Sequence, residues 1–275
     1  MSYKYTVLCF IFNGYENVRE IGEKDPEAEY LLITDDPELK SDTWRVICDH
    51  DLDGMSTFDK CFHTRWNPFK YADSDICFYV DSSVQIKRNF GHMIDDFIAG
   101  GYDMGLIAHQ SNDNFVAEYR AWEIIRDYPR AKTVKFFQML KDSHYDLNFR
   151  GLFATGMRIW RRTKLCDDIG RMVLAFLHML GDEDGIERLD QTVFTYIMHY
   201  YFPRVKLMPL SYQCLVSDYM QICCVKSAEP NLIIQYDTAV PDIKYVFNRP
   251  TQCYYLLPPG TPQPVKSPRY TYTLR

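Results

Sequence analysis

Short apolar runs bounded by polar or turn-forming residues alternate with stretches of helical spacing along most of the chain. The runs predict strands at residues 5–12, 29–34, 43–48, 75–81, 104–109, 150–162, 205–210 and 231–236. The helical spacing predicts helices at residues 56–71, 89–99, 113–127, 131–141, 164–180 and 187–201. Together these elements predict an α/β fold.

The strand at residues 75–81 is the most informative, because its uninterrupted apolar run ends on Asp81, followed by Ser82 and Ser83. Such a run is typical of a strand covered on both faces, and ligands of open α/β sheets bind beyond the carboxyl ends of these strands. A carboxylate there is placed to hold Mg²⁺ or Mn²⁺ together with substrate phosphates. The alternative is that Asp81 caps the next turn.

The first two strands also end on polar residues. Asn13-Gly14 follows the first strand and predicts a tight turn, where Asn13 is a candidate contact for a nucleotide or an ordinary turn asparagine. Asp35 and Asp36 follow the second strand, where an acidic residue often contacts the ribose or base of a nucleotide. The alternative is that Asp35 and Asp36 form an ordinary acidic turn before Pro37.

The helix predicted at residues 56–71 carries basic side chains that could approach a pyrophosphate, Lys60 and Arg65 among them. Its aromatic residues Phe58, Phe62 and Trp66 recur at a spacing of four. This stripe is expected to pack on the sheet, while the basic residues occupy another side of the same helix.

Three later positions are further candidates. His109 ends a predicted strand and is either a metal ligand or an ordinary surface histidine. Gly151 and Gly156 lie in a predicted strand, where glycine often marks close approach by a ligand or another backbone. Asp190 and Gln191 lie near the start of the last predicted helix, where the helix dipole stabilises a carboxylate, so Asp190 could also be a simple cap.

The composition narrows the class of protein. The 275 residues are 47% hydrophobic with a net charge of −6, which predicts a folded protein and argues against nucleic acid as a partner. The nine cysteines are an odd number without C-x-x-C spacing, and most of them lie in apolar runs. This pattern fits reduced, buried thiols in a cytoplasmic protein. Neither a signal peptide nor a run of about 18 apolar residues is evident, so no transmembrane helix is expected.

The C-terminal residues 256–275 are rich in proline, a composition that usually indicates disorder. We nevertheless expect this tail to lie against the body of the protein or against a neighbouring chain, through Tyr270 and Tyr272. An oligomer is therefore compatible with the sequence.

Four segments, in this order, resemble the GT-A class of nucleotide-sugar glycosyltransferases, and in particular the domain shared by plant cell-wall and mucilage proteins and bacterial polysaccharide loci. They are YTVLCFIFNGYENV, DICFYVDSSVQI, GLFATGMRIWRR and RLDQTVFTY. The resemblance implies one GT-A-like, Rossmann-like domain over residues 1–255, with a central mixed, mostly parallel sheet flanked by helices.

The resemblance also implies site residues. Asp81 would begin a D-x-D-like motif for Mn²⁺ or Mg²⁺ and the donor diphosphate, but here Ser83 replaces the second carboxylate. The predicted metal set is Asp81, Ser83 and His109. The predicted nucleotide-sugar contacts are Asn13, Asp35, Lys60, Arg65, Asp81, Ser83, Gly156 and Gln191. Asp190 would be the general base of an inverting enzyme, or would steady the donor sugar of a retaining one.

The predicted function is therefore transfer of a hexose or pentose from a UDP- or GDP-linked donor to a glycan or lipid-linked glycan in polysaccharide biosynthesis. A glycolipid acceptor would bring the protein into peripheral contact with a membrane. Two alternatives stay open: a nucleotide-sugar or glycan-binding module without turnover, and a metal-dependent phosphatase with an aspartate nucleophile. The phosphatase motif needs a second carboxylate, which Asp81-Ser82-Ser83-Val84 lacks.

Overall fold

A computed structural model describes residues 3–109, 114–118, 131–148, 151–180, 189–202, 205–210 and 219–222. The predicted strand at 231–236, the tail at 256–275 and most of the predicted helix at 113–127 lie outside these residues.

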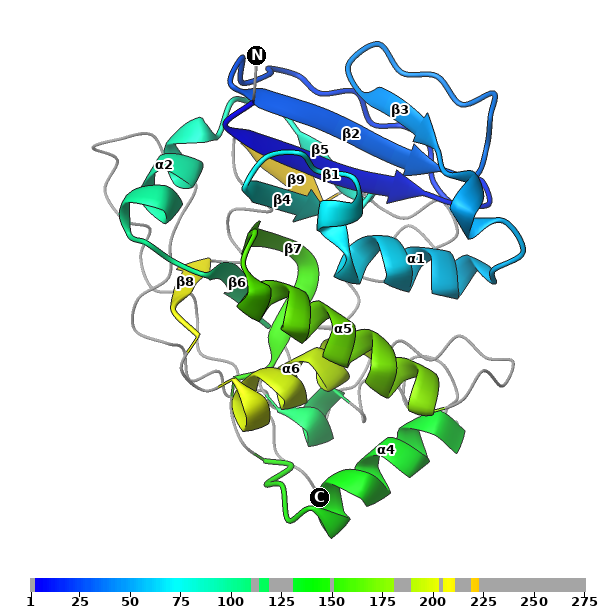
Figure 1. Cartoon of the computed structure of the whole chain (residues 1–275), viewed down its shortest axis with the longest axis vertical. Coiled ribbons are helices and arrows are strands. Elements are labelled where there is room, and N and C mark those ends of the chain that lie inside the picture. Colours follow the sequence, from blue (N-terminus) through cyan, green and yellow to red (C-terminus); the bar gives the residue numbers. More distant parts are fainter. Residues whose placement is uncertain are drawn as a thin grey trace, which may run out of the picture.

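A seven-stranded sheet forms the centre of the molecule (Figure 1). Its strands, in spatial order, are β3 (Arg45–Cys48), β2 (Ala28–Thr34), β1 (Tyr5–Ile11), β4 (Ile76–Val80), β7 (Phe153–Arg161), β6 (Met104–Ala108) and β8 (Leu207–Leu210). Strand β7 runs antiparallel to β4 and β6, whereas every other neighbouring pair is parallel. The predicted mixed, mostly parallel sheet flanked by helices is confirmed.

A second, two-stranded sheet pairs β5 (Val84–Ile86) with β9 (Met220–Ile222) in antiparallel register. Neither strand was predicted from the sequence. Each has three residues, which is too short for an alternating pattern to stand out, and the pairing joins segments that are far apart in the chain.

The described helices agree with the predicted ones. They are α1 (Thr57–Trp66), α2 (Gly91–Ala99), α4 (Ala131–Asp142), α5 (Lys164–Met179) and α6 (Asp190–Tyr201), with short 3₁₀ helices η1 (His50–Leu52) and η2 (Pro68–Lys70). Ser56 and Thr163 cap α1 and α5, because their side chains accept hydrogen bonds from backbone N–H groups in the first turn. Within the described residues, none of the helices is both long and apolar enough to cross a membrane.

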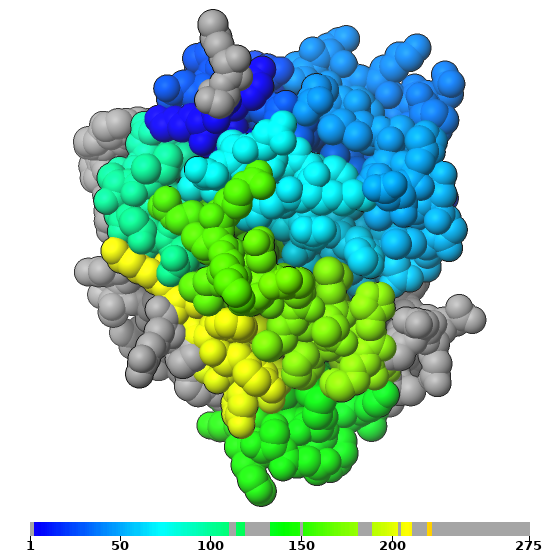
Figure 2. All heavy atoms as spheres, viewed as in Figure 1, coloured from blue at the N-terminus to red at the C-terminus, as the bar shows by residue number. Residues whose placement is uncertain are grey.

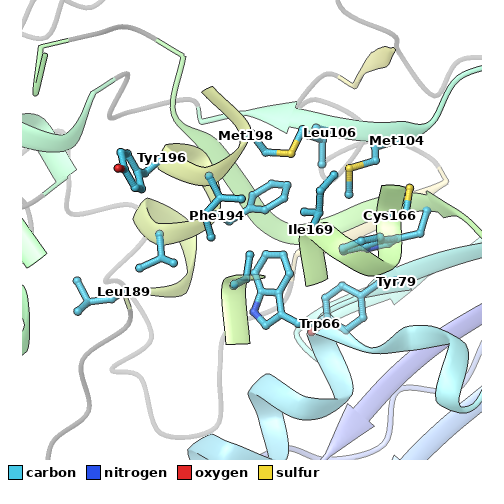
Figure 3. Packing of buried hydrophobic residues seen from close by; sticks show 14 of the residues in the cluster. Trp66, Tyr79, Met104, Leu106, Cys166, Ile169, Leu189, Phe194, Tyr196 and Met198 are labelled. Atoms are coloured by element: carbon cyan, nitrogen blue, oxygen red, sulfur yellow. The ribbon is translucent and has the colours of Figure 1, made fainter. Parts of the chain in front are cut away.

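Alternate residues of the central strands enter two separate hydrophobic cores. On β1, Val7 and Cys9 belong to the core that includes α2, while Leu8 and Phe10 belong to the core that includes α1, α5 and α6. Figure 3 shows the second core, in which side chains of the helices meet those of β4 and β6. Figure 2 shows the outer surface of this layer, where α5 (green) and α6 (yellow) lie side by side.

The predicted aromatic stripe of α1 is only partly buried. Trp66 is buried in the second core, whereas Phe58 and Phe62 are half-buried. The predicted buried thiols include Cys9 and Cys77, which lie in the central strands.

Candidate functional site

The order of the strands places a topological switch point between β1 and β4. From β1 the chain builds β2 and β3 on one side and then returns to form β4 on the other side. In open α/β sheets, ligands bind outside the carboxyl ends of the strands at this point. Asp81 directly follows β4, and Asn13 follows β1 by two residues. Two residues predicted from strand ends therefore lie at this edge.

The two-residue period of a strand decides which face the site occupies. Tyr79 belongs to the core beneath α1, α5 and α6, so Asp81, two residues later, faces the same layer. On the neighbouring antiparallel strand, Arg158 pairs in register with Tyr79. The N–H of Asp81 donates to the carbonyl of Gly156 at 2.8 Å, which places Gly156 directly beside the carboxylate.

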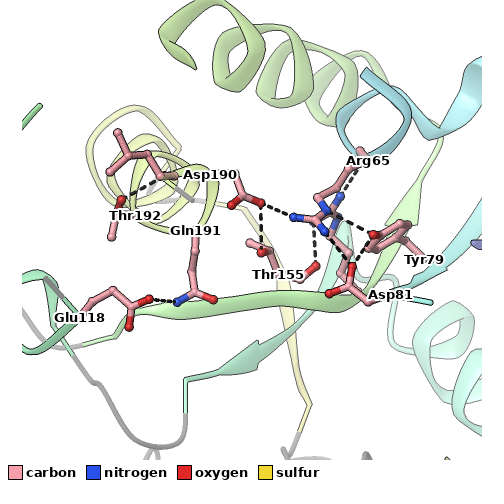
Figure 4. Close-up of polar contacts among 10 residues, drawn as sticks. Arg65, Tyr79, Asp81, Glu118, Thr155, Asp190, Gln191 and Thr192 are labelled. Atoms are coloured by element: carbon pink, nitrogen blue, oxygen red, sulfur yellow. Dashed lines mark hydrogen bonds and ion pairs between the residues drawn. The ribbon is translucent and has the colours of Figure 1, made fainter. Parts of the chain in front are cut away.

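Arg65, in the last turn of α1, joins two carboxylates that are far apart in the sequence (Figure 4). One terminal nitrogen donates to Asp81 Oδ1 at 2.8 Å, and the other donates to Asp190 Oδ2 at 2.5 Å. Its Nε donates to the hydroxyl of Tyr79 at 3.2 Å. The rings of Phe10 and Tyr79 both lie 5.6 Å from the guanidinium carbon, so the cation is held by charge, hydrogen bonds and ring faces together.

The protonation states in this cluster follow from burial and charge. Burial by itself disfavours the charged form of Arg65, but Asp81, Tyr79 and Asp190 outweigh it and hold the pKa well above its ordinary value. Burial raises the pKa of Tyr79 well above its ordinary value, so the phenol stays protonated. Tyr79 therefore donates its proton to Asp81 Oδ1 while its oxygen accepts from Arg65.

Asp190 is the first residue of α6 and is buried. Its carboxylate does not cap the helix, because the residue before it occupies the cap position without a side-chain hydrogen bond. Instead Oδ2 accepts from Arg65 and, at 3.3 Å, from the hydroxyl of Thr155. An irregularity in the pairing of β6 with β7 spans Thr155, since Leu106 pairs with Arg158 but the next residue pairs with Ala154. Such bulges commonly re-aim a side chain beside a functional site.

Arg158 is a fully buried cation beneath the site. Its guanidinium carbon lies 4.1 Å from the ring centre of Trp66 and 4.7 Å from that of Tyr79. Its terminal nitrogens donate to the backbone carbonyls of Thr155 and Arg65. Burial lowers its pKa to about 9, which leaves it charged at neutral pH. Arg158 therefore fixes the backbone of both residues that hold Asp190.

A second polar network lies at the carboxyl ends of β1 and β2. Asp35 accepts from Lys60 Nζ at 2.8 Å and from the backbone N–H of Asn13 at 2.8 Å. Burial raises the pKa of Asp35, but these two donors outweigh it and the pKa lies below its ordinary value. Asn13 and Gly14 have φ values of 54° and 59°, which confirms the predicted tight turn.

The other predicted residues lie beside these networks. Gln191 Nε2 donates to Glu118 Oε1 at 3.0 Å (Figure 4). His109 Nε2 lies 3.9 Å from Glu118 Oε2. Ser83 lies in the turn closed by the N–H of Val84 donating to the carbonyl of Asp81 at 2.9 Å. Strand β7 lies between the strands that lead to His109 and to Asp81, so the predicted metal residues come from separate parts of the sheet edge.

The donor set does not fit a divalent cation well. No group of three His, Cys, Asp or Glu side chains that could hold a metal ion occurs within the part of the chain that is described. Oδ1 of Asp81 already accepts from Arg65 and Tyr79. Oδ2 faces the backbone of Gly156, where an added Cβ would lie only 2.9 Å away.

Several residues of the site were not identified from the sequence: Tyr79, Glu118, Thr155 and Arg158. One feature of the sequence could have indicated this polar cluster: Arg158 lies between Met157 and Ile159 in a segment predicted to be a strand. Since a charged residue is rarely buried without partners, Arg158 in such a strand indicates a polar cluster.

Sequence comparisons leave the family undetermined. No family model matches the chain. No curated protein sequence matches it. Among solved structures, the chain is similar to the apo form of mouse xyloside xylosyltransferase 1, with 14% sequence identity and a TM-score of 0.42 over 73% of this chain and 83% of that chain.

Proposed function

We propose that this chain is a glycosyltransferase that moves a sugar from a nucleotide-sugar donor to a glycan or glycolipid acceptor. The observation that carries the proposal is that Arg65 joins Phe10 of β1, Asp81 after β4 and Asp190 of α6 beside Gly156 of β7. These four elements belong to the four segments that resemble GT-A glycosyltransferases. Their meeting at the switch point supports a nucleotide-sugar site.

The two polar networks are suited to different parts of the nucleotide-sugar donor. The network of Asp35, Lys60 and Asn13 is suited to the nucleoside, because it combines a carboxylate, a cation and a backbone turn at the ends of β1 and β2. The cluster of Arg65 and Asp81 is suited to the diphosphate, whose growing negative charge during transfer needs a fixed cation.

Asp190 is the candidate catalytic residue. We propose that it either accepts the proton of the acceptor hydroxyl or steadies the donor sugar, depending on the stereochemical course. Arg65 and Thr155 fix the orientation of its carboxylate, which is the preorganisation that either role requires.

The proposal is tested first by a thermal-shift screen over UDP- and GDP-sugars. A donor present at about a hundred times its Kd would stabilise the fold by about 2.7 kcal/mol, so a true ligand gives a clear shift. Hydrolysis of that donor is then compared in wild type, Asp190→Asn and the control Asp168→Asn. Asp168 lies on α5 in exposed ion pairs with Lys164 and Arg171.

We expect Asp190→Asn to lose about 100-fold or more in rate, as is typical when a general base or a fixed charge is removed. Asp168→Asn should keep the wild-type rate. Full activity of Asp190→Asn would remove this residue from the reaction. Absence of stabilisation by any nucleotide sugar would refute the proposed function.

A binding module without turnover is the second candidate. It is supported by Arg65, which engages both carboxylates of the site within the protein itself. Such a module would bind a nucleotide sugar in calorimetry without ever releasing a nucleoside diphosphate.

A further inference from the structure

Arg65 lies between the two site carboxylates and pairs with both of them. Its terminal nitrogens lie 2.8 Å from Asp81 Oδ1 and 2.5 Å from Asp190 Oδ2. Figure 4 shows the side chain between the two carboxylates. Only 16% of its side chain is exposed, compared with 31% for Asp81 and 5% for Asp190. The cation is therefore a fixed part of the site rather than a mobile surface charge.

The charges of the cluster already balance. Asp81 and Asp190 contribute two negative charges, while Arg65 and the buried Arg158 contribute two positive charges. A divalent cation on Asp81 Oδ1 would compete for the same oxygen with Arg65 and with the hydroxyl of Tyr79. It would also face two guanidinium groups, and like charges in a poorly solvated site repel strongly.

The hydrogen bonds of Arg65 leave it able to bind a ligand as well. A guanidinium group carries five N–H donors. The contacts to Tyr79, Asp81 and Asp190 use one donor on each of its three nitrogens. The second N–H on each terminal nitrogen is suited to a phosphate oxygen, since arginine binds phosphate through such paired donors.

We propose that Arg65 replaces the divalent cation of the site, so that the nucleotide diphosphate binds to the guanidinium without a metal ion. The proposal rests on the proposed function for the identity of the ligand. Arg65 neutralises the charge of the two carboxylates in the absence of the nucleotide, and it binds the diphosphate when the nucleotide is present.

The first test uses metal ions alone and needs no nucleotide. Wild type freed of metal with EDTA is titrated with MnCl₂ in calorimetry and in thermal unfolding, beside Asp81→Asn and Arg65→Met. We expect wild type and Asp81→Asn to respond alike. Arg65→Met should acquire a Mn²⁺ site, because Asp81 and Asp190 then lack their cation, and a further Asp81→Asn change should abolish it.

A Mn²⁺ site in wild type that Asp81→Asn removes would overturn the proposal. That comparison does not depend on the folding of Arg65→Met. If Arg65→Met fails to fold, Arg65→Lys keeps a cation at the position and should respond to Mn²⁺ as wild type does. A new Mn²⁺ site in Arg65→Lys would contradict the proposal.

The second test measures binding of UDP and GDP with EDTA or with MnCl₂. For the nucleotide that binds, we expect a Kd that changes by less than about two-fold between the two conditions, and a loss of about ten-fold or more in Arg65→Met with EDTA. Binding to wild type only in the presence of Mn²⁺ would overturn the proposal. If neither nucleotide binds under either condition, the proposed function fails and the diphosphate role fails with it, while the metal titration still decides whether Arg65 excludes a cation.

Discussion

Replacing Gly156 with alanine tests whether the Asp81 carboxylate must keep its present position. A Cβ at residue 156 would lie 2.9 Å from Asp81 Oδ2 and 3.5 Å from Cγ. The same carboxylate is fixed on its other side by Arg65 at 2.8 Å. Because real Cβ atoms essentially never make a contact below 3.0 Å, either the carboxylate or strand β7 must shift.

The effect on folding should be small, because two contributions oppose each other. Extra volume in a packed region costs about 1–3 kcal/mol. Alanine gains about 0.5–1 kcal/mol over glycine in the interior of a strand, since the unfolded chain loses less entropy. We therefore expect Gly156→Ala to lower the free energy of unfolding by about 1 kcal/mol. We expect the displaced carboxylate to move Arg65 away from the diphosphate. A loss of about 1.4 kcal/mol in that contact weakens nucleotide binding about ten-fold.

Gly105→Ala is the matched control. Gly105 lies in β6, and its added Cβ would approach the Ile159 side chain to 3.0 Å, which is a similar crowding away from the two carboxylates. Urea unfolding measures the stability of both variants, and calorimetry with the donor found in the screen measures binding. We expect similar losses of stability and a loss of affinity only in Gly156→Ala. Equal affinity in the two variants would refute the role assigned to the position of Asp81.

Two further predictions concern buried groups. Arg158→Met removes the donors to the carbonyls of Arg65 and Thr155. Because each unpaired carbonyl costs about 1–3 kcal/mol, urea unfolding should show a loss of about 2–6 kcal/mol. An unchanged stability would contradict the role of this cation. His199 hydrogen-bonds Tyr145 at 2.8 Å, and burial lowers its pKa from 6.5 to about 4, so the unfolded state takes up the proton first as the pH falls. The stability that the neutral imidazole contributes is complete above pH 6.5 and is lost toward pH 4, by at most about 3 kcal/mol. His199→Gln should therefore flatten this part of the pH profile of unfolding relative to wild type. Parallel profiles for the two proteins would show that another group is responsible.

The sequence by itself determined most of the elements and one edge of the site. The apolar run that ends at Asp81 predicted both a buried strand and a carboxylate at its carboxyl end, and β4 confirms the strand. The Asn13-Gly14 pair predicted a tight turn, which the left-handed φ values confirm. These features could be predicted because they depend on the spacing of residues within a short window.

Only the tertiary structure decided which side chains meet. Arg65 was predicted as a cation for a pyrophosphate, but its pairing with Asp190 joins residues 125 positions apart. Asp190 was also compatible with a helix cap, and its contact with Thr155 depends on an irregularity in the pairing of β7 that the residue pattern does not indicate. Long-range pairing and strand register depend on how whole faces pack, whereas the local sequence specifies only which face each side chain occupies.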